Sequence, residues 1–223
     1  MLVGGCLGAG GPSSEVLRLA GGADDAGPLW HEAGFENPVF YSLPAAAEPP
    51  ETGFSHQLAP LTYLTPRGSK WLPEEISWFT EGVPAALAHC GIALTKVQIV
   101  QADFTQGGRD GTTLREMIGK SPAAAGLTLL FTDEPGRQPM QAAGGADGPP
   151  APMAVIPRQG VPGGQSQPEK MAARSIGHLL GLEQLAAGAS ASTQGCEACQ
   201  FTPPQCALLK THPLVSKRDG KPA

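Results

Sequence analysis

One stretch of the sequence, residues 127–132, constrains the fold more than any other. It reads LTLLFT and is apolar or β-branched at every position. A run of this length and composition predicts a strand of the buried type, with packing on both of its faces. Shorter strands are predicted at residues 61–65, where the pattern alternates, and at residues 153–156, which are apolar. These strands predict a sheet at the centre of the domain.

Helices are predicted between these strands. Residues 73–90 follow a helical period, with apolar residues recurring on one face. Pro84 lacks the backbone donor that a helix interior needs, so we expect a kink or a break near Gly82-Val83. A strand over residues 92–104 and a short helix over residues 112–118 follow. The predicted order is therefore strand, helix, strand, helix, strand.

Length and composition suggest one domain with irregular ends. The chain has 223 residues, of which 30 are Gly and 23 are Pro, so part of it must be loop. Residues 1–56 are rich in Gly, Ala, Pro and acidic residues and predict a poorly ordered leader or linker. Residues 57–216 are the predicted globular domain. Residues 217–223, with Lys217, Arg218 and Lys221, predict a solvated basic tail.

Several classes of partner are disfavoured. The net charge of −5 comes without a basic stripe, so nucleic acid is not an expected partner. No apolar run approaches the roughly 18–20 residues that cross a bilayer, so we expect no transmembrane segment. Small residues before Cys6 resemble the end of a bacterial lipoprotein signal, although only five residues precede it. Lipidation of Cys6 and a flexible Gly-rich terminus both stay open.

The most informative helix is predicted from Pro168 to Leu180. Proline suits the first helical position, and Gly181 is a natural terminator. Arg174 and His178 are four residues apart and therefore share one face of this helix. A second face is apolar and predicts the buried side, with Ala172, Ile176, Leu179 and Leu180.

Residues 174–184, which read RSIGHLLGLEQ, resemble the metzincin motif H-E-x-x-H-x-x-G-x-x-H. Residues 127–155, with a hydrophobic strand, an acidic turn and a Gly/Pro-rich loop, resemble the segment before that helix in secreted bacterial metzincins. Residues 201–215 resemble the closing helix of the same proteins. The resemblance implies an α+β fold with a twisted four- to five-stranded mixed sheet, two long helices and a short C-terminal helix.

The resemblance also implies a zinc site that this sequence has largely lost. In the motif, three histidines bind zinc, and the Glu after the first histidine takes a proton from zinc-bound water. Arg174 and Gln184 stand at two ligand positions and Ser175 at the position of the base, so only His178 and Gly181 match. A guanidinium has no lone pair to give a metal. The Met expected in a turn beneath the metal is also missing between Gln184 and Cys196.

The cysteines near the C-terminus allow two interpretations. Cys196, Cys199 and Cys206, with His212 beyond them, have a spacing that would suit a structural zinc site. Alternatively, two of these cysteines form a disulfide, or one reaches Cys90 or Cys6. A buried free thiol at Cys90 is a further alternative. The disulfide interpretation is favoured because the chain resembles exported proteins.

Other constellations indicate ordinary structure. Residues 107–113 are Gly-rich but lack the P-loop lysine, so they predict a tight turn. Ser175 and His178 have no acidic residue placed beside them, which argues against serine hydrolase chemistry. Asp133 and Glu134 follow a buried strand and predict a solvated turn, with a cleft-lining role as the alternative.

These observations predict a catalytically inactive metzincin-like protein, exported or lipid-anchored, whose cleft still binds a peptide by strand addition. An active zinc endopeptidase with unconventional ligands and a disulfide-stapled exported domain without enzymatic activity are the alternatives. We expect no cofactor, and zinc only if the family site or the cysteine cluster is occupied. The expected partner is a peptide or protein segment.

Overall fold

The computed structural model describes residues 18–19, 23–43, 53–104, 112–133, 152–158, 168–182 and 201–218. They form a mixed α/β fold with a six-stranded sheet, in the order β1-β2-β6-β4-β7-β8, and a three-stranded sheet, β5-β3-β9. The strands are β1 (Arg18–Leu19), β2 (Glu36–Leu43), β3 (His56–Leu58), β4 (Leu61–Pro66), β5 (Ile92–Leu94), β6 (Val97–Asp103), β7 (Leu127–Thr132), β8 (Met153–Pro157) and β9 (Val215–Lys217). The helices are α1 (Ala23–Glu32), α2 (Pro73–Thr80), α3 (Gly82–His89), α4 (Thr112–Lys120), α5 (Pro168–Leu179) and α7 (Pro203–Leu209), with a 3-10 turn, η1 (Pro122–Ala125).

The large sheet is built around a block of four parallel strands. β4 pairs in parallel with β6 on one side and with β7 on the other, and β8 pairs in parallel with β7. β2 joins the block antiparallel to β6. All six residues of β7 are buried, as the apolar run at residues 127–132 predicts. The predicted mixed sheet is confirmed, although it has more strands than expected.

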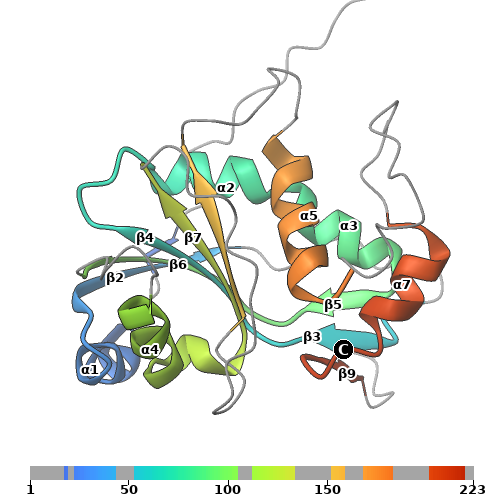
Figure 1. Cartoon of the computed structure of the whole chain (residues 1–223), viewed down its shortest axis with the longest axis horizontal. Helices are drawn as coiled ribbons and strands as arrows, with labels where there is room; N and C mark the ends of the chain where they lie inside the picture. Colours follow the sequence, from blue (N-terminus) through green and yellow to red (C-terminus); the bar gives the residue numbers. More distant parts are fainter. Residues whose placement is uncertain are drawn as a thin grey trace, which may run out of the picture.

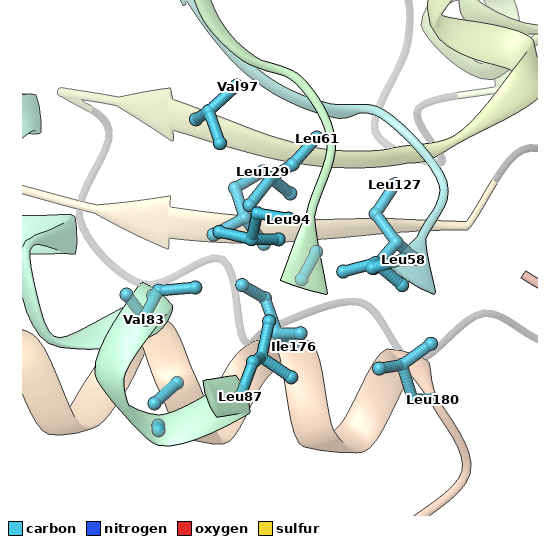
Figure 2. Packing of buried hydrophobic residues seen from close by; sticks show 14 of the residues in the cluster. Leu58, Leu61, Val83, Leu87, Leu94, Val97, Leu127, Leu129, Ile176 and Leu180 are labelled. Atoms are coloured by element: carbon cyan, nitrogen blue, oxygen red, sulfur yellow. The ribbon is translucent and has the colours of Figure 1, made fainter. Parts of the chain in front are cut away.

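Helices cover both faces of this sheet (Figure 1). On one face lie α2, α3 and α5, and α5 contacts both α2 and α3. On the other face lie α1 and α4, where Trp30, Phe35 and Ile118 are fully buried. Each face therefore has its own hydrophobic core. Figure 2 shows the first core, in which Ile176 of α5 lies beside Leu87 of α3, and Leu180, directly after α5, lies below Leu58.

The predicted helix over residues 73–90 is broken where expected. α2 ends at Thr80, Glu81 lies between the helices, and α3 begins at Gly82. Pro84 sits in the first turn of α3, where its missing N–H is tolerated. One of the two expected long helices is thus a pair of eight-residue helices, and the other is the twelve-residue α5. The short C-terminal helix is confirmed as α7.

The prediction of a poorly ordered leader over residues 1–56 is wrong for residues 23–43. This segment forms α1 and β2, and β2 pairs along β6 from Glu36 to Leu43 with a register shift. Trp30 and Phe35 are completely buried, with their ring centroids 4.8 Å apart. Burial of such large side chains outweighs the low structural propensity of the Gly- and Pro-rich flanks.

The predicted single strand over residues 92–104 is two strands in different sheets. β5 pairs with β3, whereas β6 pairs with β4 and β2. The chain changes sheets at Thr95 and Lys96, where the Thr95 hydroxyl donates to the Leu58 carbonyl at 3.1 Å. The three-stranded sheet itself was not predicted. Its third strand, β9, includes Lys217, and the Arg218 N–H donates to the Ser55 carbonyl, so these two residues of the predicted tail are part of the fold.

Candidate functional site

Helix α5 carries the residues of the motif, and its C-terminal end is well defined. Gly181 adopts a φ of +90°, its N–H donates to the His178 carbonyl at 3.0 Å, and the Leu182 N–H donates to the Gly177 carbonyl at 3.0 Å. This is a Schellman ending, in which a left-handed residue closes the helix. The predicted role of Gly181 as terminator is confirmed, and the chain turns back against the helix there.

The turn after α5 packs tightly on the helix. Gly177 is buried, and a Cβ at this position would lie 2.7 Å from Leu182 Cδ1 and 3.1 Å from Phe201 Cε1. Phe201 precedes α7, so this contact joins the end of α5 to the C-terminal segment. A side chain at position 177 would therefore need Leu182 and Phe201 to shift.

Ser175 and His178 lie on the less buried face of α5. Ala172, Ala173 and Ile176 are buried in the core, whereas Ser175 and His178 are half-buried. Position 174 lies one helical turn before His178. Gln184 lies outside the described residues, so the convergence of the three ligand positions stays a prediction.

The donor set on α5 does not fit a catalytic zinc ion. Zinc needs lone pairs from imidazole, thiolate or carboxylate groups. The helix offers one imidazole, at His178, and its neighbours at the ligand and base positions are Arg174 and Ser175. Within the part of the chain that the structure describes, no three His, Cys, Asp or Glu residues gather as a metal site would require.

A polar network lies where the parallel strands end. We call it the strand-end network; it consists of Ser69, Trp71, Glu75, Asp133 and Arg158. Arg158 follows β8 and forms two 2.7 Å hydrogen bonds with the two carboxylate oxygens of Glu75. Its guanidinium stacks over Trp71, 5.2 Å from the ring centroid, and also donates to the Lys70 carbonyl. The hydrogen bond from Arg158 lowers the pKa of Glu75 below its usual range.

The rest of the network ties the β4–α2 loop to β7. Asp133 accepts hydrogen bonds from the Ser69 hydroxyl at 3.2 Å and from the Lys70 N–H at 2.8 Å. The Trp71 indole donates to the Thr132 carbonyl at 3.1 Å. Asp133 lies half-buried in a bend directly after β7, and its carboxylate also holds the β4–α2 loop. Glu134 lies outside the described residues, as does nearly all of the predicted turn at residues 107–113.

The hydrogen bonds of this network hold the β4–α2 loop in place. Both carboxylates are engaged, Asp133 by a hydroxyl and a backbone N–H and Glu75 by a guanidinium and the Leu72 N–H. The sequence gives no indication of the strand-end network, since Glu75 and Arg158 are 83 residues apart. Only the fold brings the ends of β4, β7 and β8 together.

A separate hollow of about 290 Å³ opens at the ends of β4 and β6, beside α1 rather than α5. Its lining is mostly polar, and Asp103 there accepts a hydrogen bond from Asn37 at 3.0 Å. None of the residues predicted from the motif lies in it. The lining residues are Gly34, Glu36, Pro66, Arg67, Ala102, Asp103 and Phe104.

The structure describes two of the five cysteines, Cys90 and Cys206. Cys90, at the end of α3, forms a disulfide with Cys206 of α7 across a sequence separation of 116 residues. The free-thiol alternative for Cys90 is therefore wrong, and the alternative in which a C-terminal cysteine reaches Cys90 is confirmed. A disulfide sulfur is not a thiolate, so Cys206 does not serve the predicted structural zinc site in this state. Cys6, Cys196 and Cys199 lie outside the described residues.

His212, the fourth member of the predicted zinc set, has a structural role. Its Nδ1 accepts a hydrogen bond from the Leu214 N–H at 3.2 Å. Partial burial lowers the pKa of this imidazole, which favours the neutral form. The ring thus stabilises the turn that leads from α7 into β9.

No protein-family model, curated protein or solved structure matches this chain. Among the described residues, no helix is long and apolar enough to span a bilayer.

Proposed function

We propose that this protein is a catalytically inactive relative of the metzincin zinc metalloproteases that binds an extended peptide along β8. The observation that carries the proposal is the glycine-terminated helix α5, with His178 one turn after Arg174 and three residues before Gly181. This spacing matches the frame of the family motif, while arginine and serine replace a ligand and the base. The residue spacing of the motif is kept, whereas a zinc ligand and the base are replaced.

The position of α5 in the fold supports this interpretation. The helix follows β8 in the chain, contacts β8, and packs on the same face of the sheet as α2 and α3. A metal-binding helix needs such support, because its ligands must be held in fixed rotamers. The buried stripe of α5 supplies the support whether or not a metal is bound.

β8 is the element suited to peptide binding. It pairs with β7 on one side and, among the described strands, is the last strand of the large sheet. Four of its five side chains are buried, so its outer edge offers mainly backbone N–H and C=O groups. An extended peptide would add to this edge by main-chain hydrogen bonds and lie beside the half-buried face of α5.

The disulfide supports an extracytoplasmic location for this function. Cys90 and Cys206 join segments that are far apart in sequence, and such bridges persist in oxidising compartments. A lipid anchor at Cys6 remains part of the proposal as an optional attachment.

Restoring the family residues tests the proposal. We expect the triple variant Arg174→His, Ser175→Glu, Gln184→His to bind about one zinc ion per chain, because three imidazoles then supply the usual ligand set. Zinc would be measured by atomic emission after dialysis, with circular dichroism to check the fold. The matched control adds His178→Ala to the triple variant and should bind no zinc at that site. A folded triple variant that holds no more zinc than its control would contradict the proposal.

A further inference from the structure

The end of the molecule formed by β3, β5, β9 and α7 has an unusual charge. The chain as a whole is acidic, with 20 Asp and Glu against 15 Lys and Arg. The described segments that build this end, residues 53–60, 88–97 and 201–218, contain no Asp or Glu. Their basic side chains are Lys96, Lys210, Lys217 and Arg218, together with three histidines. The described segments of this end are therefore cationic within an acidic protein.

Several of these groups gather around Gly91. His56 of β3 is the register partner of Lys217 in β9 and of Ile92, the residue after Gly91, in β5. A Cβ built on Gly91 would lie 3.3 Å from the Ser55 hydroxyl and 3.7 Å from the Lys210 ammonium. Gly91 has a φ of +69°, and it carries no side chain that would separate the two groups. A hydroxyl and an imidazole from the start of β3 and an ammonium from the end of α7 thus lie around Gly91.

The remaining contacts fix this arrangement. The Ser55 and His56 N–H groups both donate to the Gly91 carbonyl, at 3.0 and 3.1 Å, and the Arg218 N–H donates to the Ser55 carbonyl at 3.1 Å. The Ser55 hydroxyl lies 2.9 Å from His56 Nδ1. The strand pairing of β3 therefore places the polar groups before any ligand arrives.

Lys210 and Lys217 carry like charges, and the described segments of this end contain no Asp or Glu that would compensate them. Desolvation, then Lys210 and Lys217, lower the pKa of His56 below its usual value. In the structure, Lys217 is the register partner of His56, and Lys210 lies beside Gly91. A negatively charged ligand would remove this repulsion and bind to both ammonium groups.

We propose that Ser55, His56, Lys210 and Lys217 form a binding site for a phosphate group. Lysine ammonium groups bind phosphate as point charges, and a hydroxyl adds a directional hydrogen bond. Lysine on an edge strand also discourages pairing with other chains, which accounts for Lys217 in β9. It does not account for Lys210 and Ser55, whose polar ends both lie within 4 Å of a Cβ built on Gly91.

Titration of the full chain with inorganic phosphate at constant ionic strength tests the site. The amide signals of His56 and Gly91, followed by NMR, should shift in a saturable way. Lys210→Gln and Lys217→Gln should each weaken phosphate binding about tenfold, because each removes a charged hydrogen-bond partner. Lys120→Gln is the matched control, since Lys120 is exposed on α4, on the opposite face of the large sheet. Bound phosphate should also raise the pKa of His56.

Two outcomes would overturn the site: shifts that do not saturate, or phosphate affinities that Lys210→Gln and Lys217→Gln leave unchanged. A second arm identifies the source of the phosphate group. Pelleting with phosphatidylglycerol vesicles, absent with phosphatidylcholine vesicles and reversed by inorganic phosphate, would assign it to a lipid headgroup. Saturable phosphate binding without pelleting would assign it to a soluble ligand.

Discussion

Replacing both Cys90 and Cys206 with serine is expected to lower the free energy of unfolding by about 4 kcal/mol, since the bridge closes a loop of more than 100 residues. The bridge restrains the unfolded chain, and in the folded state it joins α3 to α7. Because both cysteines are buried, two serine hydroxyls would also be left in an apolar setting. Urea denaturation followed by circular dichroism measures the difference.

Reductant supplies the matched control for the disulfide. It should lower the stability of the unaltered chain toward that of the double variant and leave the double variant unchanged. Peptide mapping without reduction should find Cys90 linked to Cys206. Equal stability of the double variant and the unaltered chain, measured under oxidising conditions, would show that the bridge does not hold α7 in place.

Gly126→Ala is expected to destabilise the fold by more than about 4 kcal/mol, the range reached only when a defined steric or packing conflict arises. A Cβ at this position would lie 1.8 Å from the Pro60 carbonyl oxygen and 2.8 Å from its carbonyl carbon. Both are backbone atoms, at the place where β4 and β7 begin side by side. Leu127 donates to the same Pro60 carbonyl at 3.0 Å, so relief of the clash would also break the first hydrogen bond between these strands.

Gly119→Ala is the matched control for this substitution. Gly119 lies in α4, and a Cβ there meets nothing within 4 Å. Alanine is favoured over glycine in a helix, so this variant should be as stable as the unaltered chain or slightly more stable. Thermal unfolding of the two variants provides the comparison. A Gly126→Ala protein that unfolds at the same temperature as the Gly119→Ala control would show that β4 and β7 do not approach as closely as described.

The sequence predicts the elements whose signal is local. The apolar run at residues 127–132 identifies β7, and the helical period with Pro84 inside it locates the break between α2 and α3. Gly181 ends α5 because a left-handed residue is needed there, and glycine is the residue that adopts this conformation most readily. Each of these signals depends on neighbours within about two helical turns.

The short strands of the three-stranded sheet were missed, or, in the case of β5, predicted only as part of a longer strand. β3, β5 and β9 have three residues each, too few to show a period, and they pair across more than 100 residues in the case of β3 and β9. The segment with α1 and β2 is hidden by its Gly- and Pro-rich flanks. Trp30 and Phe35 were the available signal of ordered structure in this segment, because disordered segments contain few large aromatic side chains.

The polar residues were the hardest to predict. Asp133 is bonded to Ser69 and Lys70, which are more than 60 residues away in the sequence, and Arg158 is bonded to Glu75. Spacing alone gives no indication of such pairs, because they depend on which strands end at the same edge of the sheet. The motif residues on α5 are readable from sequence for the opposite reason, since one helix sets their relative positions.

The zinc content of the unaltered protein tests the central claim most directly. Purified full chain, loaded with excess zinc and then dialysed, should retain none that depends on His178, and it should cleave no peptide substrate. One zinc ion per chain that is retained by the unaltered protein, lost in His178→Ala and accompanied by chelator-sensitive proteolysis would contradict the account.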